Sequence, residues 1–316
     1  MLRNYSENLQ GTVYILFSAL MYSTLPILGK LAYTHGLGTG ATLLLRYIFS
    51  FILLSVYIKW ARQGQLLSLF PPVVLQGLFL TGSSLFYFLA LKTLSAGMAT
   101  VILFAHPVLV ALFSVWFFKE KLTPRMLLGL ALAMLGISLI SGLFGSGQTD
   151  LSVKGIIWSL LACCSYTGYS LMGQKTLAVY EPLSITATVS LLAIGILIPV
   201  FPGDLALLAH VNGTQILITL VMAILSTLLA ILFFLKGVQK IGAAKATLIS
   251  TAEPMFCLLL AFLVLGEKLT PIELAGSILI FISMQLAVTH PQPQMSASAA
   301  NELPSALLRH LDRDND

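Results

Sequence analysis

Long apolar segments follow one another along the chain, separated by short stretches that contain proline, glycine or charged residues. A helix that spans a membrane needs about 20 mostly apolar residues. Ten segments meet this requirement: residues 11–32, 38–58, 72–92, 97–118, 124–143, 154–177, 183–201, 213–236, 244–265 and 271–289. Helix-breaking residues lie between them, as at Pro71-Pro72 and from Gly142 to Gly147. The pattern therefore predicts an all-α membrane protein with ten transmembrane helices.

The second half of the chain repeats the first. The pentapeptide Glu-Lys-Leu-Thr-Pro occurs at Glu120–Pro124 and again at Glu267–Pro271, an offset of 147 residues. The same offset aligns further positions: His106-Pro107 with Glu253-Pro254, Ala99-Thr100 with Ala246-Thr247, Leu112 with Leu259, and Gly129 with Gly276. A constant offset over more than forty residues indicates an internal duplication. Duplicated membrane domains are typical of transporters whose halves move around a central site.

The duplication divides the chain into four parts. Residues 1–10 form a cytoplasmic N-terminus, residues 11–146 the first five-helix repeat and residues 147–289 the second. Residues 290–316 start with His290, followed by Pro-Gln-Pro-Gln and then small residues, so we expect a disordered cytoplasmic tail.

Lysine and arginine predict the orientation, because cytoplasmic loops carry an excess of both. With the N-terminus inside, 12 of them fall in inside segments and four fall outside, at Lys30, Lys92, Lys154 and Lys268. Both termini are therefore predicted to be cytoplasmic, with Lys236, Lys240 and Lys245 at the inner membrane boundary. A repeat of five helices is odd-numbered, so the second copy enters the membrane upside down. The fold predicted is two inverted repeats, with the Glu-Lys-Leu-Thr-Pro loops on opposite faces.

Composition excludes several classes of protein. The chain is 58% hydrophobic and only 9% charged, against about 25% charged residues in soluble domains, so the lipid bilayer must solvate it. A net charge of +5 reflects the excess of lysine and arginine in cytoplasmic loops and does not indicate a nucleic-acid partner.

The cysteines and the motif content argue against bound groups and catalysis. Cys163, Cys164 and Cys257 lie in apolar segments and lack the spacing of metal ligands, so we expect small core residues, no disulfide, no metal and no cofactor. Enzyme motifs such as a phosphate loop or His-Glu-x-x-His are missing from the sequence, which argues against an enzyme.

Several sequence features are similar to those of a known family. These features are Arg46, the stretch from Ala90 to Pro107, Glu120-Lys121-Leu122-Thr123 followed by Gly129, and the counterparts Glu253-Pro254 and Glu267-Lys268-Leu269-Thr270 followed by Gly276. Over residues 11–289 the chain resembles the EamA-like, ten-helix branch of the drug/metabolite transporter superfamily. The resemblance implies transport of a small organic metabolite by alternating access. It leaves the substrate open, because members carry amino acids, nucleobases, sugars, drugs or sugar phosphates.

Glu253 and His106 are the first candidates for a functional site. Glu253 lies about nine residues into the ninth predicted helix, roughly 13 Å deep, where an ionised carboxylate costs several kcal/mol unless it is paired or solvated. It is a candidate for proton coupling or substrate binding, or alternatively a structural polar residue paired to a neighbouring helix. His106 is its repeat mate at the same depth, and a buried histidine is either a hydrogen-bonded core residue or a partner of Glu253 or substrate.

Pro107, Pro254 and Arg46 are the next candidates. Each proline lacks the N–H that would bond to the carbonyl four residues earlier, that of Leu103 or Ser250. Water, substrate or a side chain must satisfy these carbonyls, so we expect helix kinks beside a central cavity. Arg46 lies about eight residues into the second helix, where it is costly to bury. It either anchors neighbouring helices, binds an anionic group or extends to the outer surface.

Aromatic residues complete the predicted site. At an offset of 144 residues Tyr22 matches Tyr166, and at 147 residues Tyr87 matches Phe234. Aromatic side chains at matching depths either line a pocket for an organic solute or serve as packing.

These features together predict a secondary transporter of a small organic metabolite, such as an amino acid or related compound, in the plasma (inner) membrane. Export or proton-linked exchange is the expected mode, and a homodimer is left open. A lipid-linked flippase or membrane-embedded enzyme subunit would need a headgroup site rich in cations, and Arg46 alone lies deep enough. A passive channel is the third alternative.

Overall fold

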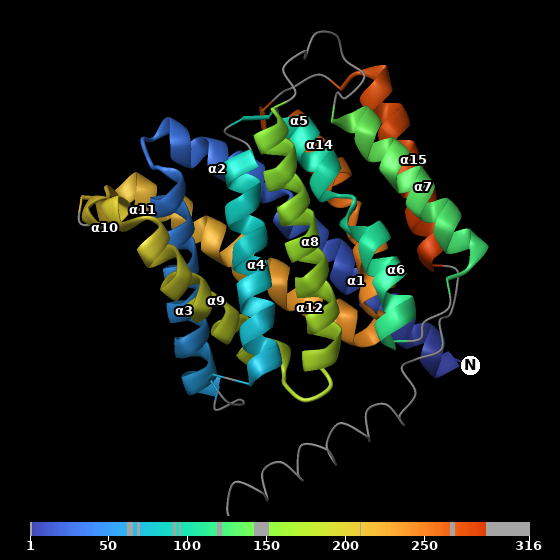
Figure 1. Ribbon diagram of the computed structural model, residues 1–316, viewed down its shortest axis with the longest axis horizontal. Helices are drawn as coiled ribbons and strands as arrows, with labels where there is room; N and C mark the ends of the chain where they lie inside the picture. The colour runs from blue at the N-terminus through green and yellow to red at the C-terminus, as the bar shows by residue number, and fades with distance from the viewer. Residues whose placement is uncertain are drawn as a thin grey trace, which may run out of the picture.

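The computed structural model consists of helices packed into one bundle (Figure 1). It describes residues 2–61, 66–67, 70–90, 93–94, 96–118, 122–141, 152–208, 210–265 and 269–288. Within these ranges every regular element is helical. The predicted tail at 290–316, the boundary between repeats at 146/147 and the loop residues Glu120, Lys121, Glu267 and Lys268 lie outside the described residues.

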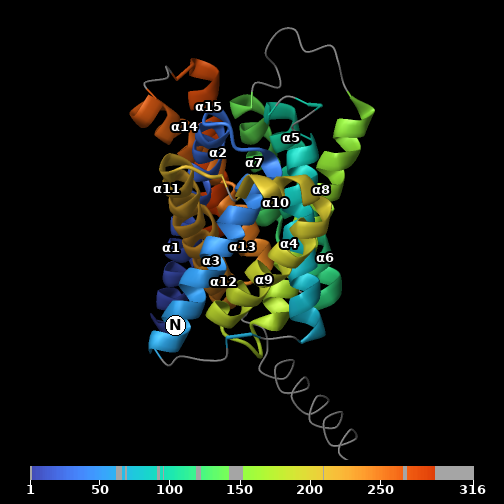
Figure 2. The same ribbon diagram turned by 90° about the vertical axis from the view of Figure 1, so that its left-hand side faces the viewer.

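The helices occur in the following order. They are α1 (Leu2–Tyr22), α2 (Thr24–Thr34), α3 (Thr39–Ala61), α4 (Pro71–Ala90), α5 (Ala96–Leu103), α6 (His106–Phe118), α7 (Pro124–Ile140), α8 (Val153–Thr176), α9 (Pro182–Val200), α10 (Pro202–Leu208), α11 (Gly213–Met222), the π-helix η1 (Ala223–Leu229), α12 (Ala230–Ile241), α13 (Ala243–Ser250), α14 (Glu253–Leu265) and α15 (Pro271–Val288). The view turned by 90° shows the longer helices running side by side along one direction (Figure 2).

Eight helical segments of the described chain are long and apolar enough to cross a membrane. Two further apolar helices, α7 and α15, have only 17 and 18 residues, fewer than the about 20 that a full span needs. The structure thus gives eight candidate spans of full length where the sequence predicted ten. Large apolar side chains such as Trp116 and Leu263 remain 75% and 65% exposed, as expected of a surface that faces lipid.

Two local differences from the sequence prediction have simple causes. Helix α1 begins at Leu2 and not at residue 11, because residues 2–10 contain no proline or glycine. The short helix α10, which was not predicted, places the Asp204 carboxylate 3.0 Å from the backbone nitrogen of Ala41. Asp204 thereby accepts a hydrogen bond at the beginning of α3, where N–H groups lack helical partners.

Glycine allows α7 and α15 to pack closely. A Cβ atom at Gly136 would lie 2.7 Å from the carbonyl oxygen of Gly276, and the reverse distance is also 2.7 Å. At the other end of this contact, the Ser283 hydroxyl donates a hydrogen bond to the Gly129 carbonyl at 2.7 Å. Residues later in α7 therefore contact residues earlier in α15, so the two helices run antiparallel. Figure 1 shows them as a pair on one side of the bundle.

Three other helix pairs are antiparallel in the same way. In the pair α1 and α12, Gly237 packs against Ile15 and the Ser18 hydroxyl donates to the Ala230 carbonyl. In the pair α4 and α8, Gly168 packs against Phe79 and Gly173 against Gln76. In the pair α3 and α9, the Ser50 and Ser190 hydroxyls are 3.4 Å apart and Gly40 packs against Phe201. Small residues at these contacts let the backbones approach, as is usual where lipid replaces water.

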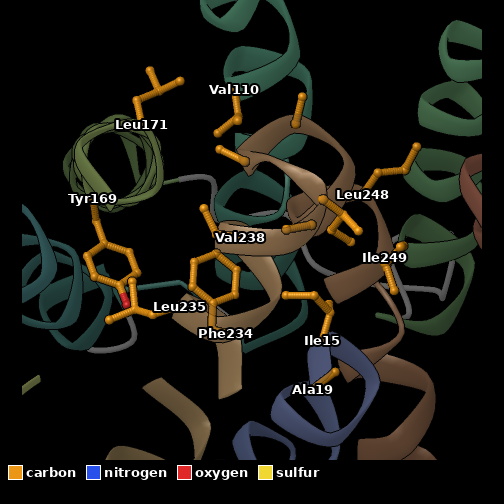
Figure 3. Packing of buried hydrophobic residues seen from close by; sticks show 14 of the residues in the cluster. Ile15, Ala19, Val110, Tyr169, Leu171, Phe234, Leu235, Val238, Leu248 and Ile249 are labelled. Carbon is orange, nitrogen blue, oxygen red and sulfur yellow. The ribbon is translucent and has the colours of Figure 1, made fainter. Parts of the chain in front are cut away.

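The largest buried apolar cluster lies where α1, α8, α12 and α13 meet (Figure 3). Ile15, Tyr169, Phe234 and Leu248 are each at most 1% exposed. All eight residues of α13 are buried. This packed region positions the aromatic side chains described next.

Candidate functional site

Two helical spans are interrupted at matching places. Helix α5 ends at Leu103 and α6 begins at His106, while α13 ends at Ser250 and α14 begins at Glu253. Pro107 and Pro254 are the second residues of α6 and α14. Glu253 therefore lies in the first turn of a helix, where the helix dipole favours a negative charge.

His106 compensates for the hydrogen bond that Pro107 cannot make. Its Nδ1 lies 3.0 Å from the carbonyl oxygen of Leu103, the acceptor that the ring of Pro107 leaves without a helical donor. Nδ1 must donate in this contact, because a carbonyl oxygen can only accept. In the neutral ring Nε2 is then an acceptor, and this buried atom has no hydrogen-bond partner in the protein.

An aromatic chain runs from His106 into the core. The ring centroids of His106 and Tyr166 are 4.4 Å apart, and those of Tyr166 and Tyr169 are 5.5 Å apart. Tyr169 stacks on Phe234 with a centroid distance of 5.7 Å and an interplanar angle of 22°. Figure 3 shows Tyr169, from α8, and Phe234, from α12, facing each other. His106 is thus connected to Phe234 through tyrosines of α8.

Three tyrosines lie within electrostatic range of Glu253. They are Tyr22, Tyr87 and Tyr166. The Tyr87 hydroxyl is 3.0 Å from the Thr100 hydroxyl, which fixes the tyrosine beside the glutamate. In the part of the chain that the structure describes, no charged side chain offsets the desolvation of Glu253. Its side chain keeps an intermediate exposure.

Arg46 is buried and has aromatic neighbours of its own. It is 4% exposed, so it does not extend to the outer surface as one reading of the sequence had it. Its guanidinium carbon lies 4.7 Å from the centre of the Tyr47 ring, an attractive arrangement for a cation. Tyr22 is within electrostatic range of both Arg46 and Glu253. The Nε atom of Arg46 is buried and has no hydrogen-bond partner in the protein.

The structure therefore places all seven sequence-predicted site residues in one connected region. Tyr22 is within electrostatic range of both Glu253 and Arg46. Tyr166 is within range of Glu253, and its ring packs against that of His106. Tyr87 is also within range of Glu253. Phe234 lies at the inner end, against Tyr169. Tyr166 touches the His106 ring and lies near Glu253, so it is the link between these repeat mates.

Sequence reasoning missed two tyrosines. Tyr169 follows Tyr166 by three residues, which places both on one face of a helix, and this spacing was available in the sequence. Tyr47 lies under Arg46 and its hydroxyl is 3.2 Å from the hydroxyl of Ser84. Its role depends on tertiary contacts, so no local signal marks it.

Sequence reasoning also missed a π-helix, which lies opposite the break between α1 and α2. In η1 the Thr227 hydroxyl reaches the Met222 carbonyl five residues earlier, and the Ser226 hydroxyl is 2.8 Å from the hydroxyl of Thr24. Thr24 begins α2, immediately after the interruption at Ser23. π-Helical segments are rare and occur frequently at functional sites.

One sequence-based assignment is wrong, and one residue is more buried than its expected position suggested. Lys245, expected at the membrane boundary, is 3% exposed, and its Nζ donates to the Asn8 side-chain oxygen at 3.4 Å. All residues of its helix α13 are buried. Among the cysteines Cys163 is buried, as expected, but Cys164 is exposed, because consecutive helical residues point in different directions. The described residues contain no group of three or more His, Cys, Asp or Glu side chains suited to a metal ion.

Comparison with known families identifies the class of protein. The model of the EamA-like transporter family matches residues 9–142 and, a second time, residues 153–289. The two matches together cover most of the chain. This chain belongs to the EamA-like transporter family.

Curated relatives of this EamA-like transporter are transporters. The chain is 28% identical over 243 residues to the uncharacterized transporter YxxF of Bacillus subtilis, covering 76% of this chain and 75% of the relative. It is 28% identical over 234 residues to a probable amino-acid metabolite efflux pump of Salmonella typhimurium, covering 69% and 77%. It is 28% identical over 240 residues to the threonine/homoserine exporter RhtA of Escherichia coli, covering 74% and 76%.

The fold of this EamA-like transporter has also been seen by crystallography. A solved crystal structure superimposes with a TM-score of 0.76 at 20% sequence identity, covering 88% of this chain and 96% of the other. The protein is therefore a multi-pass membrane transporter and not an enzyme.

Proposed function

We propose that this EamA-like transporter moves a small organic metabolite of the amino-acid type across the plasma (inner) membrane by alternating access. Export or proton-linked exchange is the mode of transport, and Glu253 is the central binding or coupling group. Two relatives named for amino-acid export support the substrate class. A relative named as an inner membrane transporter, YicL of Salmonella typhimurium, supports the location.

The observation that carries the proposal is the setting of Glu253. A carboxylate in a membrane-spanning segment is costly, and here Tyr22 lies within electrostatic range of both this carboxyl group and Arg46. A carboxylate and a guanidinium that share an aromatic neighbour suit a solute that carries both charges. The residues come from α1, α3, α4, α8 and α14, that is, from both halves of the sequence.

The antiparallel helix pairs support the inverted repeat on which alternating access depends. Under the sequence offsets α7 corresponds to α15, and α3 to α9, and each pair packs antiparallel. The same correspondence exchanges α1 with α8 and α12 with α4, so the pair α1 and α12 has its counterpart in α8 and α4. Two inverted halves of five helices explain these paired contacts, with α7 and α15 as the short fifth helices of the two halves. In such transporters one half moves against the other around the central site.

Transport by purified protein in liposomes tests the proposal, with L-threonine as the first substrate. In Glu253→Gln the amide keeps the size of the side chain but cannot cycle a charge. If Glu253 carries the coupling proton, concentrative transport is lost while exchange persists. If it pairs with the substrate's ammonium group, binding itself weakens.

Glu181→Gln is the matched control, because Glu181 is exposed and makes no side-chain capping bond. Transport in Glu253→Gln that equals the control in rate and in pH dependence, at normal expression, contradicts both roles of Glu253. Failure of the unmodified protein to move any amino acid in a broad panel contradicts the substrate class.

A further inference from the structure

Hydrogen-bond donors without partners gather in one part of the interior. Eight buried side-chain polar atoms of the described chain lack a hydrogen-bond partner in the protein, and four of them belong to the candidate site. Three of these four can donate: the Tyr22 hydroxyl of α1, the Tyr169 hydroxyl of α8 and Arg46 Nε of α3. They come from three different helices.

The three donors share one neighbourhood. Tyr22 packs against the buried cluster that contains Tyr169, and it is within electrostatic range of both Tyr169 and Arg46. Arg46 is held over the Tyr47 ring at 4.7 Å, and Tyr47 is itself fixed by the contact of its hydroxyl with Ser84 at 3.2 Å. Tyr169 is fixed by stacking on Phe234. The donors are therefore positioned by packing and not by bonds of their own.

Buried donors without partners lower the stability of a protein, and other tyrosines of this site do have partners. A buried polar group without a partner destabilises a protein by about 1–3 kcal/mol, and most buried polar groups are paired. Tyr47 and Tyr87 in the same region have hydroxyl partners in Ser84 and Thr100. Tyr22 and Tyr169 differ from them in this respect, so their hydroxyls are available to a ligand.

We propose that Tyr22, Tyr169 and Arg46 form an oxyanion subsite that binds the carboxylate of the transported solute. Two O–H donors and a guanidinium N–H are the groups that carboxylate oxygens prefer. In the described part of the chain no carboxylate forms an ion pair with Arg46, so its charge is left for the ligand. This subsite rests on the proposed function and gives a specific role to one end of the substrate.

Glu253 determines what the rest of the ligand must carry. Tyr22 is also within electrostatic range of Glu253, so a simple anion at the subsite meets a nearby acidic group. A zwitterion suits both neighbours, with its carboxylate on the three donors and its ammonium group toward Glu253. The subsite therefore selects amino acids over their amides, esters and decarboxylated amines.

Calorimetric titration of the purified full-length protein tests this selection. The probes are matched pairs of acid and amide: L-threonine with L-threoninamide, L-leucine with L-leucinamide and L-phenylalanine with L-phenylalaninamide. The amide keeps the ammonium group but loses the negative charge. We expect at least one acid to bind about tenfold or more tightly than its amide, since hydrogen bonds to charged groups are the stronger ones.

Single-atom variants then assign the preference to the donors. Tyr22→Phe and Tyr169→Phe each remove one hydroxyl that has no partner in the protein, so both variants are expected to fold. Each should weaken binding of the acid by about tenfold and leave binding of the amide nearly unchanged. Tyr57→Phe is the control, because Tyr57 lies on the same helix as Arg46 but is 45% exposed on its outer side.

The possible results distinguish a failure of the subsite from a failure of the proposed function. Equal binding of acid and amide in every pair, or a preference that survives both Tyr22→Phe and Tyr169→Phe, overturns the subsite alone. Selective binding of an acid without transport supports the subsite and contradicts the proposed function. The absence of binding by every probe contradicts both.

Discussion

Nδ1 of His106 lies 3.0 Å from the carbonyl oxygen of Leu103. This is the carbonyl that Pro107 deprives of its usual helical donor. The histidine therefore compensates for the proline, because its side chain replaces a missing backbone hydrogen bond inside a membrane span. His106 thus has a structural role in addition to its contact with Tyr166.

The first prediction follows from this replacement. His106→Ala leaves the Leu103 carbonyl without its donor, which should lower the free energy of unfolding by about 1–3 kcal/mol. Pro107→Ala restores a backbone N–H, so His106→Ala should cost less in that background. Thermal unfolding of both single variants and the double variant measures the coupling. Equal costs of His106→Ala in both backgrounds would show that the histidine does not replace the backbone donor.

The second prediction concerns the close contact of α7 and α15. Gly136→Ala places a methyl group 2.7 Å from the Gly276 carbonyl oxygen, so the helices must separate. Overpacking of this kind costs about 1–3 kcal/mol. Gly195→Ala is the matched control, because it lies within α9 and its Cβ would meet nothing within 4 Å. Thermal unfolding should show a lower midpoint for Gly136→Ala and an unchanged or higher one for Gly195→Ala.

Much of the fold could be read from hydrophobic patterning, because lipid imposes long apolar helices and breakers mark their ends. Sequence position also predicted that Glu253, His106 and Arg46 lie deep in the membrane, since depth along a helix is proportional to residue number. Their convergence depends on how helices rotate about their axes. The structure supplies this information, and it brings Tyr22 within electrostatic range of both Arg46 and Glu253.

Other features had no local signal. Residues Ala223–Leu229 contain no proline or glycine, yet they form a π-helix, because packing against α1 and Thr24 determines their geometry. The burial of Lys245 likewise depends on the neighbouring Asn8. The helix caps are the opposite case: Thr123 and Thr270 precede prolines at helix starts, a local pattern that is typical of N-caps.

The third prediction tests these caps. The Thr123 hydroxyl accepts from the Met126 N–H at 3.3 Å. Thr270 accepts from the Glu273 N–H at 3.3 Å, and its own N–H donates to the Glu273 carboxylate at 2.7 Å, which forms a capping box. Alanine at either threonine should lower stability by about 1 kcal/mol, measured by thermal unfolding. Substrate preference should not change, and a clear switch in preference would place the site elsewhere.

The last prediction concerns orientation in the membrane. If the two five-helix halves are inverted, equivalent loops must lie on opposite sides, because an odd number of helices separates them. Reporter fusions should place both termini, Lys121 and Lys240 in the cytoplasm, and Gln148 and Lys268 outside. The antiparallel contact of α7 with α15 favours this arrangement, because these helices follow the two equivalent loops and run in opposite directions. Lys121 and Lys268 are the decisive pair, since both belong to copies of the same pentapeptide. Their appearance on the same side would remove the inverted repeat, and with it the proposal that two inverted halves alternate around Glu253.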